Sequence, residues 1–163
     1  MKYELSLPGF EEQQLAIEVR FPFRPRIFAN KKVVKSNTGK WNELAMRRDD
    51  GLTSIVHILP KFPDPVPQLE MDEETYKVVE PFTWSQRLFA LLPIAFVIFA
   101  VMDPKLIFWG VGLGAISIYI NFWLLRLQQG KLERNLMIIT VTIAAAAILF
   151  IIRLLIIRSE IGL

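Results

Sequence analysis

The most informative pattern along this chain is a change near residue 80, from short apolar runs broken by turns to long, nearly uninterrupted apolar runs. Residues 88–157 hold three apolar stretches separated only by short polar breaks. Only the hydrocarbon interior of a bilayer allows so much apolar surface to stay away from water in so short a chain. We therefore expect a mixed fold, in which a soluble β-rich domain (1–80) precedes a membrane domain (81–163).

Three transmembrane α-helices are predicted from the apolar runs, at about 84–102, 106–125 and 136–157. The apolar part of the first run, 88–102, rises about 22 Å as a helix, which is short of a hydrocarbon core of about 30 Å. It spans only if Trp84 and Arg87 lie at one interface and Asp103 at the other. The alternative is that this first run is a re-entrant hairpin.

The first 80 residues alternate between apolar and polar positions over short stretches, which predicts half-buried β-strands. Strands are expected at 3–7, 15–21, 26–34 (with Asn30-Lys31 as a tight turn), 41–47, 52–59, 66–71 and 75–79. Asp50-Gly51, between two β-rich runs, favours a hairpin. Four prolines in 60–67 require an edge, a loop or a polyproline II segment. The domain is therefore predicted to be a small all-β sandwich or barrel.

The distribution of charge predicts how the chain is oriented in the membrane. Residues 1–80 carry a net charge of −1 and residues 81–163 a net charge of +4, so the overall excess of positive charge flanks the apolar runs. One side of the three predicted spans has Lys77, Arg87, Arg126, Lys131 and Arg134, and the other has Lys105, Arg153 and Arg158. The positive-inside rule therefore favours a cytoplasmic N-terminal domain and a C-terminus on the opposite side.

Small and polar residues in the second and third runs predict helix–helix contacts. Gly110 and Gly114 form a small-xxx-small pair, and residues 144–147 are four alanines at about the same depth. We expect these patches to cross inside one chain; the alternative is a homo-oligomer contact through the two glycines. Helix packing is accordingly assigned to Gly110, Gly114, Ser117, Asn121, Ala144 and Ala147, with Asn121 as a hydrogen-bonding residue between helices.

A charged residue inside an apolar run is a candidate functional group, and Arg153 is the one such residue in the third run. Its long side chain can also extend to the nearby interface, because it lies only four residues before Ile157. Asp103 is expected at the same outer level. We predict an ion pair there, between Asp103 and either Arg153 or Arg158.

A basic stretch in the N-terminal domain has no acidic residue between Glu18 and Glu43. Its members are Arg20, Arg24, Arg26, Lys31, Lys32, Lys35 and Lys40. They could bind the anionic headgroups of the inner leaflet, at about 1 kcal/mol for each close charge. The alternatives are an acidic protein partner and an ordinary solvated strand edge guarded by lysines.

Several kinds of chemistry have no support in the sequence. The chain has no cysteine and one histidine, His57, which excludes disulfides, thiolate catalysis and Cys-based metal sites. We find no catalytic motif, no cofactor loop, no metal-ligand pattern and no basic aromatic face for nucleic acid, and no motif specific enough to name a family. The expected function is therefore a non-catalytic accessory, scaffolding or assembly subunit that contacts lipid and a membrane partner or itself. The alternatives are a homo-oligomeric channel or transporter lined by the second span and, with weaker support, a membrane enzyme acting on headgroups.

Overall fold

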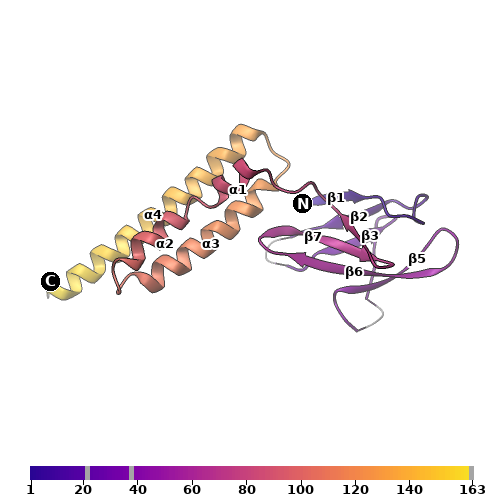
Figure 1. Ribbon diagram of the computed structural model, residues 1–163, viewed down its shortest axis with the longest axis horizontal. Helices are drawn as coiled ribbons and strands as arrows, with labels where there is room; N and C mark the ends of the chain where they lie inside the picture. The colour runs from indigo at the N-terminus through magenta and orange to yellow at the C-terminus, as the bar shows by residue number, and fades with distance from the viewer. Residues whose placement is uncertain (21–22, 37–38, 162–163) are drawn as a thin grey trace. The chain divides into compact units, whose positions relative to one another are not determined.

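The chain forms two compact units, Met1–Pro81 and Phe82–Leu163, in the computed structural model, which describes residues 1–20, 23–36 and 39–161 (Figure 1). The division lies one residue beyond the boundary that the change in hydropathy predicts. The first unit contains the β-strands and the second contains the helices.

The first unit consists of two antiparallel four-stranded sheets in which the strands follow one another in sequence order. One sheet contains β1 (Lys2–Leu5), β2 (Leu15–Glu18), β3 (Arg26–Ala29) and β4 (Lys32–Val33). The other contains β5 (Glu43–Arg47), β6 (Thr53–Lys61), β7 (Asp64–Met71) and β8 (Glu74–Lys77). The prediction of an all-β domain is therefore confirmed. Phe21, which was expected to continue the second strand, lies outside the described residues.

A two-residue turn explains why there are eight strands rather than the seven expected. Asn30 and Lys31 both have positive φ, of 50° and 67°, so the predicted strand 26–34 folds back on itself as β3 and β4. Asp72 and Glu73 adopt the same conformation between β7 and β8. Turns with two positive φ values match the right-handed twist of paired strands, which makes them the favoured short hairpin connections.

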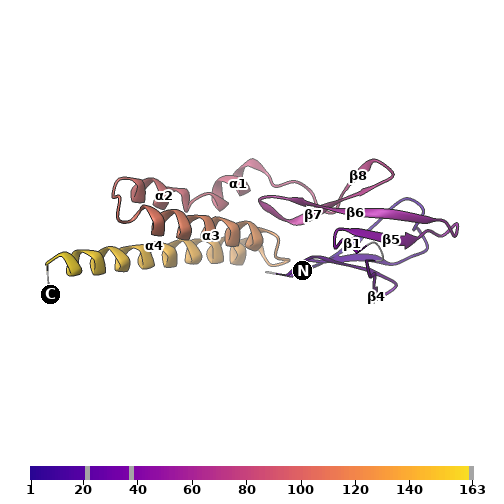
Figure 2. The same cartoon turned by 90° about the horizontal axis from the view of Figure 1, so that it is seen from below.

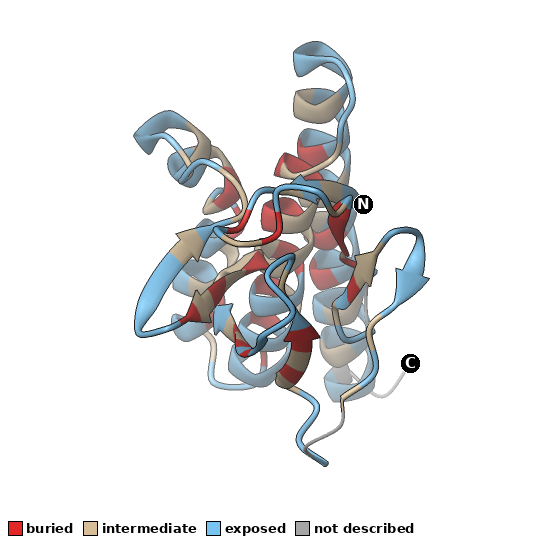
Figure 3. Ribbon diagram, turned by 90° about the vertical axis from the view of Figure 1, so that its right-hand side faces the viewer, coloured by how far each residue is buried: buried red, intermediate tan, exposed pale blue. Residues whose placement is uncertain are grey.

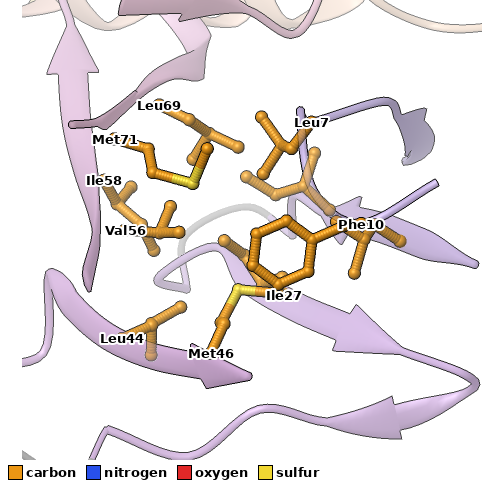
Figure 4. Close-up of a cluster of buried hydrophobic side chains, with 11 residues drawn as sticks. Leu7, Phe10, Ile27, Leu44, Met46, Val56, Ile58, Leu69 and Met71 are labelled. Atoms are coloured by element: carbon orange, nitrogen blue, oxygen red, sulfur yellow. The ribbon is translucent and has the colours of Figure 1, made fainter. Parts of the chain in front are cut away.

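The two sheets share one hydrophobic core, which follows from the alternation of buried and exposed residues along their strands (Figure 3). In β6, Val56 and Ile58 are buried, whereas Ile55, which points to the opposite face of the sheet, is exposed. The labelled core residues come from both sheets and from the loop after β1 (Figure 4): Leu7, Phe10, Ile27, Leu44, Met46, Val56, Ile58, Leu69 and Met71.

The proline-rich segment occupies an edge, one of the three possibilities that its composition allowed. Pro65 and Pro67 lie in the first half of β7, whereas β8 pairs only with its second half, from Gln68 to Met71. Proline has no backbone N–H, so it is tolerated where a strand has no neighbour to receive that hydrogen bond.

The second unit contains α1 (Trp84–Ala90), α2 (Ile94–Val101), α3 (Ile107–Leu125) and α4 (Lys131–Ile161) (Figure 2). Among the described residues, two helices, α3 and α4, are long and apolar enough to cross a membrane. The pair α1 and α2 meets the same test only when taken together, and it is bent by 45° at its break.

The break corrects the prediction of one continuous helix over 84–102. Pro93 has no N–H and disfavours helical geometry at the residue before it, so the helix cannot pass through this point unchanged. The backbone instead makes hydrogen bonds between residues three apart, as in a 3₁₀-helix. They run from the Ile94 N–H to the Leu91 carbonyl (2.9 Å) and from the Phe96 N–H to the Pro93 carbonyl (3.0 Å). The start of α1 is fixed by a capping box between Thr83 and Gln86.

Helix α4 is longer than its apolar run. It has 31 residues and rises about 46 Å, because the polar residues on both sides of 136–157 continue the helix. A boundary placed where hydropathy falls therefore underestimates the helix, since charged residues are good helix formers at its exposed ends. The extension carries Glu160 into the helix, which matters for the contacts described below.

Candidate functional site

The two glycines predicted to pack helices together lie against α2. A Cβ atom added to Gly110 would lie 2.0 Å from the Ala100 Cβ, and one added to Gly114 would lie 2.5 Å from the Val97 Cγ2. Both glycines are buried. Their partner is therefore the helix before α3, and this contact covers the surface that the alternative homo-oligomer contact would have used.

Ala144 and Ala147 do not take part in this contact, which corrects their assignment as partners of the glycines. Both are exposed, whereas Ile138, Ala145 and Leu149 on the same helix are buried. In a helix with 3.6 residues per turn, the buried residues share one face and the two alanines point away from it. A run of four alanines covers every direction around the helix, so the run alone did not identify which alanine packs.

A polar contact joins α3 to the break between α1 and α2. The Asn121 side chain is fully buried, and its Nδ2 donates to the Ala90 carbonyl oxygen (3.3 Å) and to the Thr142 Oγ1 on α4 (3.4 Å). Thr142 in turn donates to the Ile138 carbonyl (2.8 Å). Because Ala90 ends α1, Asn121 supplies a donor to a carbonyl at the point where the helix stops. This places Asn121 in the role between helices that its position predicted, and Ser117, one turn earlier, is buried on the same side.

The Asn121 contact has a measurable energetic consequence. Asn121→Leu keeps the volume of the side chain but removes the donor to Ala90, so we expect a loss of roughly 1 kcal/mol in the free energy of unfolding of the full chain in detergent micelles. Hydrogen exchange should accelerate most in α1. Ser159→Ala is the control, because it also removes a side-chain donor. The Ser159 hydroxyl donates to a carbonyl of its own helix, so this variant should leave hydrogen exchange in α1 unchanged. Equal exchange in both variants would contradict the contact.

An ion pair that the sequence did not single out joins the α2–α3 connection to the C-terminal end of α4. Lys105 Nζ pairs with Glu160 Oε1, while Asp103 accepts a hydrogen bond from the Lys105 backbone N–H (3.1 Å). The predicted pair of Asp103 with Arg153 or Arg158 stays a prediction, and the carboxylate that Lys105 reaches is that of Glu160. Lys105 can reach Glu160 because the extra length of α4 brings this carboxylate to the level of the α2–α3 connection. The hydrogen bond to Glu160 and its negative charge raise the pKa of Lys105.

Part of the basic stretch is already engaged within the β-unit. Arg20 pairs with Glu18 (2.8 Å), Lys40 pairs with Glu43 (2.9 Å), and the Arg24 guanidinium lies 5.2 Å from the centre of the Trp41 ring. The remaining four are exposed and have no ion-pair partner among the described residues: Arg26, Lys31, Lys32 and Lys35. The unneutralised charge is thus concentrated on and beside the β3–β4 hairpin.

The acidic turn after β7 is organised by an arginine that the sequence did not single out. Arg48 Nη1 lies 3.2 Å from an Asp72 carboxylate oxygen, and its Nε lies 3.9 Å from Asp50. The neighbouring Tyr76 hydroxyl donates to the Glu74 carboxylate (2.8 Å), and this bond raises the pKa of Tyr76. These contacts tie the hairpins at one end of the second sheet together and give the acidic residues a structural role.

The described residues contain no group of three or more His, Asp or Glu side chains placed to hold a metal ion. His57 Nδ1 lies 3.9 Å from a Glu43 carboxylate oxygen, across the β5–β6 pair. No protein-family model matches this chain, and comparisons with curated proteins and with solved structures return no match.

Proposed function

We propose that this chain is a non-catalytic accessory subunit of a membrane complex, anchored by three spans and docked to its partner through an exposed face of α4. The proposal has three parts: how the helices cross the bilayer, which surface meets the partner, and what the β-unit contributes. Each part rests on contacts within a single unit.

The proposal counts α1 and α2 as one broken span. At one end, the Phe82 ring, just before α1, lies 5.4 Å from the Phe122 ring and beneath the Arg126 guanidinium at the end of α3. At the other end, Ala100 in α2 meets Gly110 near the start of α3. The α1–α2 pair therefore runs antiparallel to nearly the whole of α3, which rises about 28 Å and matches a hydrocarbon core. A re-entrant segment would return to the side from which it entered.

Three crossings place the N-terminal unit and the α3–α4 loop on the same side of the membrane. That side carries Lys77, Arg87, Arg126, Lys131 and Arg134, and the opposite side carries Lys105, Arg153 and Arg158. The positive-inside rule then assigns the β-unit to the cytoplasm and the end of α4 to the other side.

The docking surface is a stripe of small residues on the exposed side of α4, and this observation carries the proposal. Thr140, Ala144 and Ala147 lie at intervals of four and three residues and are all exposed, on the side of α4 away from its buried face. Small residues let two helix backbones approach closely, which is how helices associate in lipid, where no hydrophobic force drives them together.

The alternative of a pore lined by the second span is less well supported. Its polar stripe would consist of Ser117 and Asn121, and both side chains are buried within the helical unit, with Asn121 bonded to Ala90 and Thr142. To line a pore between copies of the chain, these side chains would have to lie on the outside of the helical unit, and they do not.

The β-unit would then present the β3–β4 hairpin at the cytoplasmic surface. The exposed Arg26, Lys31, Lys32 and Lys35 carry charge that no described carboxylate pairs with. The proposal assigns them to the anionic inner leaflet, to which such charges contribute about 1 kcal/mol each at close range. The same positive side chains could instead contact an acidic segment of the partner protein.

Site-specific photo-crosslinking in native membranes tests the docking surface. A photo-reactive residue at Ala147 should give a discrete protein adduct, and the same residue at Ala115, an exposed alanine on α3, should not. When the photo-reactive residue is placed at Ala144 instead, adding Ala147→Leu to the same chain should reduce the yield of the protein adduct. An adduct of twice the chain's mass would identify the partner as a second copy, and reaction with lipid alone at both positions would refute the proposal.

A further inference from the structure

An apolar groove runs between α2 and α4 on the outside of the helical unit. It encloses about 190 Å³, and its floor is formed by Leu106 and Leu149, which are buried. Its walls are Phe96 and Phe99 from α2 and Ala146 and Phe150 from α4. Pockets that hold a whole small ligand usually exceed about 300 Å³, so this groove is sized for part of a longer apolar molecule.

The groove ends at a positive charge that has no ion-pair partner among the described residues. Arg153 lines it one turn beyond Leu149, toward the C-terminal end of α4, and no described carboxylate pairs with it. Nearby, Glu160 pairs with Lys105 and Asp103 accepts from a backbone amide, so the acidic groups at this end have other partners. Arg153 lies seven residues before Glu160, about 10 Å deeper along the helix.

We propose that this groove binds one anionic glycerophospholipid, with an acyl chain between α2 and α4 and the phosphate on Arg153. The order of the groups matches the ligand, because the chain lies toward the middle of the helices and the charge toward their end. A guanidinium binds phosphate oxygens in a bidentate manner, with charge-assisted hydrogen bonds that strengthen where water is scarce. The site is separate from the Thr140–Ala144–Ala147 stripe, which lies on another side of α4.

Native mass spectrometry of the full chain in a mild detergent can measure this binding. Dioleoyl phosphatidylglycerol should bind roughly tenfold more tightly than dioleoyl phosphatidylcholine, which has the same chains, and glycerol phosphate without chains should not bind measurably. Arg153→Gln should reduce phosphatidylglycerol binding to the level of phosphatidylcholine. Ala146→Leu, which fills the groove, should weaken the binding of both lipids.

Two matched variants separate this site from general effects of charge and size. Lys131→Gln removes a positive charge at the opposite end of α4, and Ala115→Leu enlarges an exposed alanine outside the groove; both should bind phosphatidylglycerol as the unchanged protein does. Equal binding of the two lipids by the unchanged protein would overturn the proposal without reference to any variant. So would a loss in Lys131→Gln equal to that in Arg153→Gln, provided that helicity and elution volume are the same.

Discussion

Gly110→Ala is expected to destabilise the helical unit by about 1–3 kcal/mol, although it adds a single methyl group. The added Cβ would lie 2.0 Å from the Ala100 Cβ and 3.4 Å from the Phe96 carbonyl oxygen, so α2 and α3 have to move apart. Separation of the helices weakens the packing along their whole contact, since interiors are close-packed and transmit such a shift. The free energy of unfolding of the full chain in mixed micelles, followed as a denaturing detergent is added, measures the effect.

Gly112→Ala is the matched control for this experiment. Gly112 lies two residues further along the same helix, and a Cβ there would meet nothing within 4 Å. Alanine is the better helix former by up to about 1 kcal/mol, so this variant should be neutral or slightly stabilised. If the two variants had the same stability, the close contact between α2 and α3 would be wrong.

Ile58→Ala is expected to have the largest effect in the β-unit, with a loss of about 2–5 kcal/mol. Ile58 is 1% exposed and lies in the core shared by the two sheets. A unit of this size buries a small core and has little stability to spare, so much of it should unfold. Hydrogen exchange of the β5–β7 amides in the full chain measures the change as lost protection.

Ile55→Ala makes the same chemical change on the other face of the same strand. Ile55 is 47% exposed, so its truncation should cost less than about 1 kcal/mol and leave the exchange rates nearly unchanged. Comparable loss of protection in both variants would mean that the alternation along β6 does not define which face is buried.

Most of the β-unit could be predicted because each strand carries its own local signal. Alternating apolar residues identify the strands, and Asn30-Lys31 was identified as a tight turn that the backbone confirms. Positions of strands follow from such local patterns, because the side chains alternate between faces whatever the partner strand is. The number of strands was less accessible, since a turn with two positive φ values at Asn-Lys is a weak signal beside Asn-Gly or Asp-Gly.

Helix contacts were harder to predict than helix positions. The composition of 106–125 defined α3, but it could not say whether Gly110 and Gly114 face the helix before or the helix after it. In lipid, every side of a span is apolar, so hydropathy does not indicate which side is buried. The break at Pro93 follows from a signal that is visible in the sequence, because a proline inside a helix removes a backbone hydrogen bond and clashes with the preceding turn.

The residues that we assign to lipid binding illustrate the same limit. Arg153 stood out as a charge within an apolar run, and its isolation depends on Glu160 pairing with Lys105, a contact between residues 55 positions apart. The groove beside it is formed by two helices that are not adjacent in the chain. Such features arise only from the packing of the folded helices, whereas the polar role of Asn121 could be inferred from its place in a span.

Extraction of membranes from cells that produce the full chain is the most direct test of the central claim, that the unit 82–163 lies within a bilayer. The account predicts that the protein stays in the membrane pellet after washes with high salt and with alkaline carbonate, and that only detergent releases it. Recovery of the full chain in detergent-free buffer, as a compact monomer, would contradict the account.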